Sequence, residues 1–210
     1  MTHWHPRPDD HGKPVAIHAP HAPSTLAAWG DPSAVACAVP SGVVPPMLNG
    51  LAVVAWHEAP KSDEGWEAIA AASPIAEPPF VCPPGMKPAA GALVLESDGR
   101  AWCVAPTGRF GGHEFTLPKG RIDGRSLAAT ALVEVFEESG LRVRLLSFLC
   151  DVLRKETYSR FYLAERIGGS PADVTWESQA VLLAPMPALR TMLTHPGDQA
   201  VLDAFDAARG

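Results

Sequence analysis

The chain contains few of the residues that crosslinked or nucleic-acid-binding proteins need. Only four cysteines occur in 210 residues, none in a Cys-x-x-Cys pair, so neither a disulfide framework nor a structural zinc site is expected. The 17 Lys and Arg residues are outnumbered by 23 Asp and Glu residues, which argues against a general grip on nucleic acid or anionic membranes. We therefore expect a cytoplasmic protein without nucleic acid or membrane partners.

A long apolar run is missing as well. The longest one, residues 43–56, is too short and too interrupted to span a bilayer. The first ten residues, "MTHWHPRPDD", lack the apolar core of a signal peptide. Because 47% of the residues are hydrophobic, the chain can still bury a full core, and we expect a soluble globular protein.

The first 84 residues differ in composition from the rest. Fifteen of the 22 prolines precede Pro88, and five of the eight histidines lie within the first 21 residues. This composition predicts an extended arm, and the irregular histidine spacing argues against a defined metal site. A short helix is expected around "EGWEAIAAAS". Three tryptophans should anchor the extension to the main domain or to a second subunit; they are Trp29, Trp56 and Trp66. We divide the chain into a Pro/His-rich, partly packed extension (1–84) and a second domain (85–210).

Strand and helix signals alternate in the second domain. "AAGALVLE" and "AWCVAP" read as two strands joined by an Asp-Gly turn. Strands are also expected at "HEFTLP", "VRLLSFLCDVL", "SRFYLAERI" and "QAVLLAP", and helices at "MPALRTMLTH" and "GDQAVLDAFDAAR". This mixture predicts an α/β or α+β arrangement, in which helices cover a sheet.

One helix carries a cluster of like charges. Ser126 as N-cap and Gly140 as C-cap predict a helix from about 127 to 139. Its apolar stripe consists of Ala128, Ala131, Leu132 and Val135. Three glutamates, at positions 134, 137 and 138, repel one another on another face, with only Arg142 within one turn to relieve them. A solvated acidic helix end is one interpretation, and a site for Mg²⁺ or Mn²⁺ is the other.

The surrounding sequence resembles the Nudix hydrolase family. Its signature is Gly, five residues, Glu, seven residues, Arg-Glu, an apolar residue, any residue, Glu-Glu, any residue, Gly, apolar. Gly120 matches the first glycine, Glu134 the glutamate of the Arg-Glu pair, and Glu137 and Glu138 the Glu-Glu pair. The resemblance implies a Nudix-type α/β/α sandwich with a mixed sheet from about 85 to 210, preceded by the Pro-rich extension.

The chain departs from the signature at three points. The segment between Gly120 and Glu134 is one residue shorter, the loop glutamate is replaced by Arg125 or Ser126, and the helix arginine is Val133. In the family the missing glutamate and arginine form a supporting ion pair. The chain has thus lost both partners of the pair and kept the helix glutamates, and Asp123 is a candidate substitute for the missing carboxylate.

The resemblance also implies roles for individual residues. Glu134 and Glu138 are expected as direct metal ligands, Glu137 as a further ligand or a group that positions water, and the Gly120 carbonyl as another ligand. Lys119 and Arg121 flank the glycine and could bind substrate phosphates, although an ordinary basic loop is the alternative. Further candidates are a general base and four residues of the substrate cleft; they are Glu177 as the base, and Arg109, His113, Arg160 and Tyr162.

The expected function is hydrolysis, dependent on Mg²⁺ or Mn²⁺, of a pyrophosphate bond in a nucleoside diphosphate linked to another moiety. "PKG" resembles Nudix proteins that act on diadenosine polyphosphates or diphosphoinositol phosphates, and ADP-ribose stays open. The alternative is a Nudix-fold module that binds or senses a nucleotide without turnover, and a structural protein without a site is a third. Partners are expected to be small phosphorylated molecules, and the apolar extension leaves a homodimer open.

Overall fold

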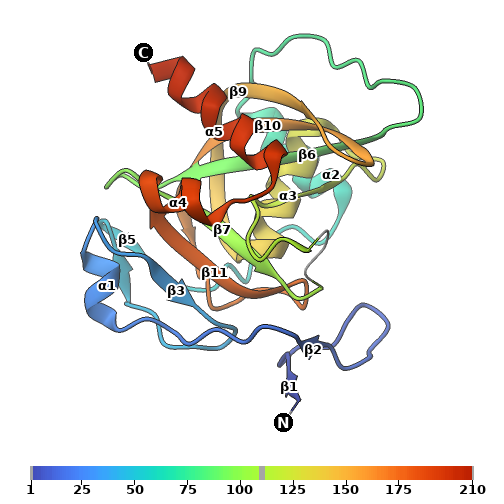
Figure 1. Cartoon of the computed structure of the whole chain (residues 1–210). Helices are drawn as coiled ribbons and strands as arrows, with labels where there is room; N and C mark the ends of the chain where they lie inside the picture. Colours follow the sequence, from blue (N-terminus) through green and yellow to red (C-terminus); the bar gives the residue numbers. More distant parts are fainter. Residues whose placement is uncertain (1, 109–111, 210) are drawn as a thin grey trace.

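The computed structural model describes residues 2–108 and 112–209, which form a mixed α/β structure (Figure 1). Before residue 85 the elements are β1 (His3–Trp4), β2 (Ala16–Ile17), α1 (Leu26–Gly30), β3 (Ala36–Ala38), β4 (Met47–Leu48), β5 (Leu51–Ala52) and α2 (Asp63–Ala72). The later elements are β6 (Lys87–Leu95), β7 (Arg100–Pro106), β8 (Lys119–Arg121), α3 (Leu127–Ser139), β9 (Leu141–Leu153), β10 (Thr157–Gly169), β11 (Ser178–Pro185), α4 (Met186–Met192) and α5 (Pro196–Arg209).

A seven-stranded mixed sheet forms the centre of the molecule. Its strand order is β3-β11-β7-β6-β10-β9, and β8 pairs with β6 beside this path. β10 runs parallel to β6, whereas the other pairings are antiparallel. The predicted turn between β6 and β7 is confirmed, with Gly99 at φ 87°, a conformation that glycine adopts without a steric cost. The predicted α/β architecture is therefore confirmed.

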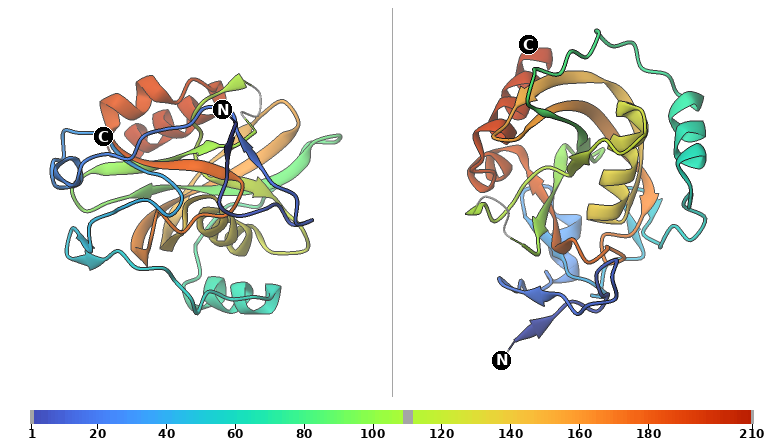
Figure 2. Two further views of the ribbon diagram at one scale, coloured as in Figure 1. Left: turned by 90° about the horizontal axis from the view of Figure 1, so that it is seen from below. Right: turned by 90° about the vertical axis from the view of Figure 1, so that its right-hand side faces the viewer.

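Helices lie on both sides of the sheet (Figure 2). α4 and α5 cover one face, α3 covers the other, and α2 packs on the outside of α3. The caps predicted for α3 are confirmed, since Ser126 Oγ accepts from the Ala129 N–H and Gly140 adopts a left-handed conformation with φ 69°. The apolar stripe predicted for α3 was too narrow. All residues from Ala129 to Val135 are buried, because α2 also covers the outer side of α3.

Aromatic side chains attach the extension to the domain, as predicted. Trp29 is 2% exposed and packs against Trp102 of β7 at a ring-centroid distance of 6.1 Å. Trp66 of α2 packs on Phe136 of α3 at 5.7 Å, and Trp56 meets both rings edge-on. Part of the extension also enters the central sheet, because β3 pairs with β11.

Two buried arginines also reach from the sheet into the extension. Arg100 donates to the carbonyl oxygens of Ala28 and Trp29, the latter at 2.6 Å. Arg166 pairs with Glu96 and donates to the Leu48 carbonyl at 2.9 Å. In the described parts of the chain, no helix combines the length and apolar character that a bilayer span requires.

One predicted strand is wrong. Within "HEFTLP" the only ladder contact is an isolated bridge between Thr116 and Val104. The segment instead leads into the short strand β8, which pairs with β6 so that Gly120 lies opposite Ala90.

Candidate active site

The loop before α3 and the glutamates of α3 meet at one place. The backbone N–H of Lys119 donates to Oε2 of Glu138 at 3.0 Å. Gly120 lies so close to Glu134 that a Cβ atom added to it would be 2.1 Å from the carboxyl group. Only glycine therefore allows the β8 backbone to approach this carboxylate.

A third carboxylate joins the two from α3. Glu177, just before β11, brings a carboxylate oxygen within 4.8 Å of those of Glu134 and Glu138. Two of the three groups come from α3 and the third from the segment before β11, and the fold brings these two segments together. Oxygen donors of this kind suit a hard divalent cation such as Mg²⁺ or Mn²⁺.

Burial makes this cluster electrostatically unfavourable without a cation. Glu134 is 9% exposed, and burial followed by repulsion from Glu138 and its neighbours raises its pKa to about 8. Burial raises the pKa of Glu138 to about 7, against the opposing effect of Lys119. The pKa of Glu177 is raised for the same reason, burial. The glutamates of α3 are buried or half-buried, which favours the metal-site interpretation over a solvated acidic helix end.

Glu137 differs from the other two glutamates of α3 in its contacts. Its backbone carbonyl accepts hydrogen bonds from the N–H and the hydroxyl of Thr175, the latter at 2.9 Å. Its carboxyl group is not among the three that lie within 4.8 Å of one another in the part of the chain that the structure describes. Burial and the charge of Glu177 raise its pKa, so its role as a ligand or a water-positioning group stays a prediction.

Two hollows flank the carboxylates, and both are bordered by Lys119, Glu138 and Glu177. The first has a volume of about 490 Å³ and includes the predicted phosphate-binding residue Arg121, along with Asp123 and Arg125. The second, of about 360 Å³, is lined by basic and imidazole side chains and their neighbours; among them are His113, Arg154, Lys155 and His195. The site thus offers positive groups on both sides of the acidic centre.

Of the four cleft candidates, His113 lies beside the site, and Arg109 lies outside the described residues. The predictions for Arg160 and Tyr162 are wrong. The Arg160 guanidinium binds Asp151 at 2.8 Å, and the Tyr162 hydroxyl donates to Glu77 at 2.6 Å. Both residues support the segment that leads from α2 to β6.

Arg142, the expected partner of Glu138, lies elsewhere. Its guanidinium stacks over the ring of Trp56 at 4.8 Å. Glu138 is instead bound by the Lys119 backbone N–H. The spacing placed Arg142 within one turn of Glu138, but Arg142 belongs to β9 (Leu141–Leu153), where its guanidinium contacts Trp56 and not Glu138.

The N-terminal arm reaches the segment that carries Glu177. A ring nitrogen of His5 lies 3.2 Å from the Ser178 carbonyl oxygen, and Arg7 pairs with Asp173. The indole N–H of Trp176 donates to Asp10 at 3.1 Å. The arm is thus fixed beside the site, which the proline content alone did not predict.

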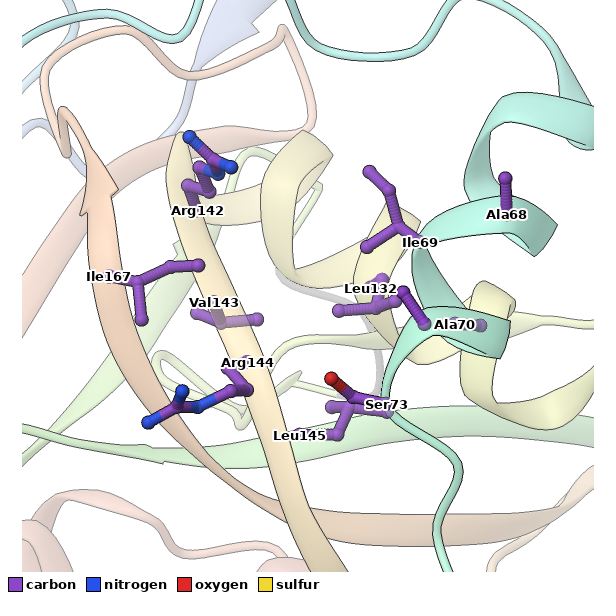
Figure 3. Close-up of a pocket in the computed structure, with 11 residues that line it drawn as sticks. Ala68, Ile69, Ala70, Ser73, Leu132, Arg142, Val143, Arg144, Leu145 and Ile167 are labelled. Atoms are coloured by element: carbon purple, nitrogen blue, oxygen red, sulfur yellow. The ribbon is translucent and has the colours of Figure 1, made fainter.

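A further hollow of about 370 Å³ lies between α2 and β9, apart from the carboxylates (Figure 3). Its walls are mainly apolar, with Ile69 of α2 facing Leu132, Val143 and Leu145. Arg144 at its rim pairs with Glu165. This hollow holds none of the acidic groups that the chemistry above requires, and we assign it no function.

Comparison with known proteins agrees with the fold. The family model described as NUDIX domain matches residues 85–199, more than half of the chain. The chain therefore belongs to the NUDIX family, as the resemblance predicted. Its members form a class of pyrophosphohydrolases that generally use divalent metals. No curated protein gives a significant match.

Solved structures with a similar fold include two hydrolases of named substrate. An Ap4A hydrolase from C. elegans has 17% identity and a TM-score of 0.49, covering 58% of this chain and 97% of that one. An ADP-ribose pyrophosphatase from Streptococcus suis has 20% identity and a TM-score of 0.45, with coverages of 59% and 92%. A putative Nudix hydrolase family member from Chromobacterium violaceum has 23% identity and a TM-score of 0.49, with coverages of 61% and 81%. None is similar enough to assign a substrate.

Proposed function

We propose that the chain is a divalent-metal-dependent hydrolase that cleaves the pyrophosphate bond of a nucleoside diphosphate linked to another moiety. The observation that carries this proposal is the triad of Glu134, Glu138 and Glu177, whose carboxylate oxygens lie within 4.8 Å of one another. Buried carboxylates with raised pKa values are costly unless a cation compensates them.

The residues fit Mg²⁺ or Mn²⁺. Glu134, Glu138 and Glu177 would hold the cation, and the Gly120 carbonyl is a candidate further ligand, since the Gly120 backbone lies against the Glu134 carboxyl group. Glu137 remains a candidate further ligand. A bound cation would neutralise charge on the phosphoryl oxygens and lower the pKa of a bound water molecule.

The remaining side chains would bind and orient the substrate. Lys119 borders both hollows and Arg121 one of them, so their positive charges can hold phosphates on either side of the scissile bond. Glu177 is the candidate general base if it does not bind the cation, because burial raises its pKa and a more basic carboxylate accepts a proton from water more readily. The attacking water would form a bond to phosphorus as the bond to the leaving phosphate oxygen breaks.

The substrate class stays broad. Positive groups in both hollows suit a substrate with a charged phosphate on each side of the cleaved bond, as in a dinucleoside polyphosphate. ADP-ribose and related compounds remain alternatives. The substrate is expected to be a small phosphorylated molecule.

A nucleotide-binding module without turnover is the second candidate. Two observations favour it: the loop before α3 is one residue shorter than the Nudix signature, and Val133 is a fully apolar core residue where the family has arginine. Buried carboxylates at the proposed metal site favour the enzyme, because nucleotide binding alone does not require them.

Product release separates the two candidates. Wild type and Glu138→Gln would be incubated with diadenosine polyphosphates, ADP-ribose, nucleotide sugars and diphosphoinositol phosphates, with Mg²⁺, with Mn²⁺ and with a chelator. Metal-dependent cleavage that Glu138→Gln removes supports the enzyme. If no compound is cleaved while nucleotide raises the melting temperature, the binding module is the better account.

A further inference from the structure

The loop that leads from Gly120 to α3 is bound by a side chain from the extension. Glu67 of α2 accepts two hydrogen bonds from Ser126, from the backbone N–H at 2.5 Å and from the hydroxyl at 2.8 Å. Ser126 is also the N-cap of α3, since its Oγ accepts from the Ala129 N–H at 3.2 Å. One serine thus joins α2, the loop and the first turn of α3.

A second contact from the same helix binds the neighbouring residue. Asp63, at the start of α2, pairs with the Arg125 guanidinium at 2.7 Å. The Arg125 side chain is only 18% exposed. Two successive loop residues are therefore bound by two carboxylates that lie one turn apart on α2.

The position of α2 is itself fixed. Trp66, next to Glu67 in sequence, is 6% exposed and packs on Phe136 of α3 at a ring-centroid distance of 5.7 Å. Trp56 closes this aromatic group edge-on against both rings. Because large buried aromatics resist displacement, the Glu67 carboxylate is presented to Ser126 in one defined place.

From these contacts, we propose that Glu67 is a positioning residue of the active site and that α2 replaces the support which this chain lacks. The loop determines where Gly120 lies relative to Glu134, and these two groups are already too close to accept a Cβ atom. A loop displaced by a fraction of an ångström would change the arrangement of the metal-binding oxygens. The inference rests on the proposed metal site.

The interior of α3 shows why this support must come from outside the helix. Val133 is 1% exposed and packs in the apolar core, so it offers no charge to a carboxylate in the loop. Asp123 borders the larger hollow, whereas Ser126 and Arg125 donate hydrogen bonds to the carboxylates of Glu67 and Asp63. A carboxylate of the extension thus takes the place of one in the loop.

The test measures Mn²⁺ binding to the full-length chain by calorimetry, together with kcat and KM for a cleaved compound. Glu67→Ala is compared with Glu67→Gln and with the control Glu64→Ala. Glu64 lies on the same helix, is exposed, and has no described contact with the loop. We expect Glu67→Ala to weaken Mn²⁺ binding about 10- to 100-fold, the usual effect of losing an outer support. The kcat should fall while KM changes little.

Glu67→Gln distinguishes positioning from stability. Its amide oxygen can still accept from Ser126, so it should recover most of the affinity that Glu67→Ala loses, with both variants melting within a few degrees of wild type. The inference is overturned if wild type binds Mn²⁺ and Glu67→Ala binds it equally, or if Glu67→Gln is as weak as Glu67→Ala. If wild type itself binds no Mn²⁺, the proposed metal site fails first and this inference with it.

Discussion

Gly120 and Glu134 approach each other so closely that a Cβ atom on Gly120 would lie 2.1 Å from the carboxyl carbon of Glu134. This contact joins β8 to α3 across the loop between them. It makes the backbone of β8, and not only the glutamate side chains, part of the proposed metal site.

Gly120→Ala should therefore weaken metal binding. The added methyl group must push Glu134 or the strand away, and we expect Mn²⁺ affinity to fall at least about 10-fold. Gly30→Ala is the control, because a Cβ atom at Gly30 meets nothing within 4 Å. Equal affinities of the two variants in a calorimetric titration would show that the close approach has no role in metal binding.

Glu177→Gln tests the third carboxylate. Because Glu177 is proposed as a ligand or a general base, Glu177→Gln should lower kcat by about 100-fold or more. Removing its charge also relieves repulsion at Glu137 and Glu134, so the metal-free variant should melt no lower than wild type. Steady-state kinetics and thermal melting, with the exposed Glu58→Gln as control, check both effects. Full activity of Glu177→Gln would remove it from the site.

Stability should fall as pH rises in the metal-free protein. Glu134 and Glu138 have pKa values of about 8 and about 7 in the fold, above the ordinary 4.5. The unfolded chain gives up these protons first, so their contribution to stability is complete below about pH 4.5 and is lost as pH rises toward 8. Urea unfolding between pH 5 and pH 8 should show this decline, with a smaller slope for Glu134→Gln. An identical slope would contradict the raised pKa of Glu134.

Metal affinity should change with pH in the opposite direction. The ligands must lose their protons to bind a cation, so apparent Mn²⁺ affinity should rise between about pH 6 and pH 8 and binding should release protons. Titrations in buffers of different ionisation enthalpy measure the released protons. Affinity that is constant over this range would mean that the cation binds elsewhere.

The aromatic contact between α2 and α3 should contribute strongly to stability. Trp66→Ala should lower the free energy of unfolding by about 3–5 kcal/mol, because it leaves a cavity between Trp56 and Phe136. Trp4→Ala is the control, since Trp4 is 57% exposed and should cost less than about 0.5 kcal/mol. Urea unfolding followed by circular dichroism compares them. A similar cost for both would mean that α2 is only loosely attached.

The division at residue 84 can be tested by expressing residues 85–210 alone. We expect this fragment to fold poorly, because Arg100 and Arg166 would lose carbonyl partners at Trp29 and Leu48. Their ion pairs with Asp98 and Glu96 lie within the fragment and would remain, but buried donors that lose their acceptors are destabilising. A fragment with cooperative unfolding and wild-type metal affinity would show that the extension is dispensable.

Local signals in the sequence predicted local structure well. Ser126 and Gly140 gave the bounds of α3, and Asp98-Gly99 gave the turn between β6 and β7, because caps and tight turns depend on a few neighbouring residues. The strand predicted at "HEFTLP" is wrong because a local pattern does not determine whether a segment pairs with another strand. Its alternating pattern suits a strand, but only Thr116 finds a partner.

Contacts between distant segments could not be predicted in this way. Glu177 was recognised as a candidate base, but its place beside Glu134 and Glu138 depends on how β11 is ordered in the sheet. The bond from Glu67 to Ser126 depends on how α2 packs on α3. In each case sequence indicated the residue type, whereas the topology determined which residues meet.

The central claim is that Glu134, Glu138 and Glu177 together hold a divalent cation. The most direct measurement is a calorimetric Mn²⁺ titration of wild type and Glu138→Gln at pH 8, which is above the pKa of Glu138, about 7, and at that of Glu134, about 8. We predict saturable binding to wild type and a loss of at least about 100-fold in Glu138→Gln, beyond the effect of an outer support. Wild type that binds no Mn²⁺, or a variant that binds it equally well, would contradict the account.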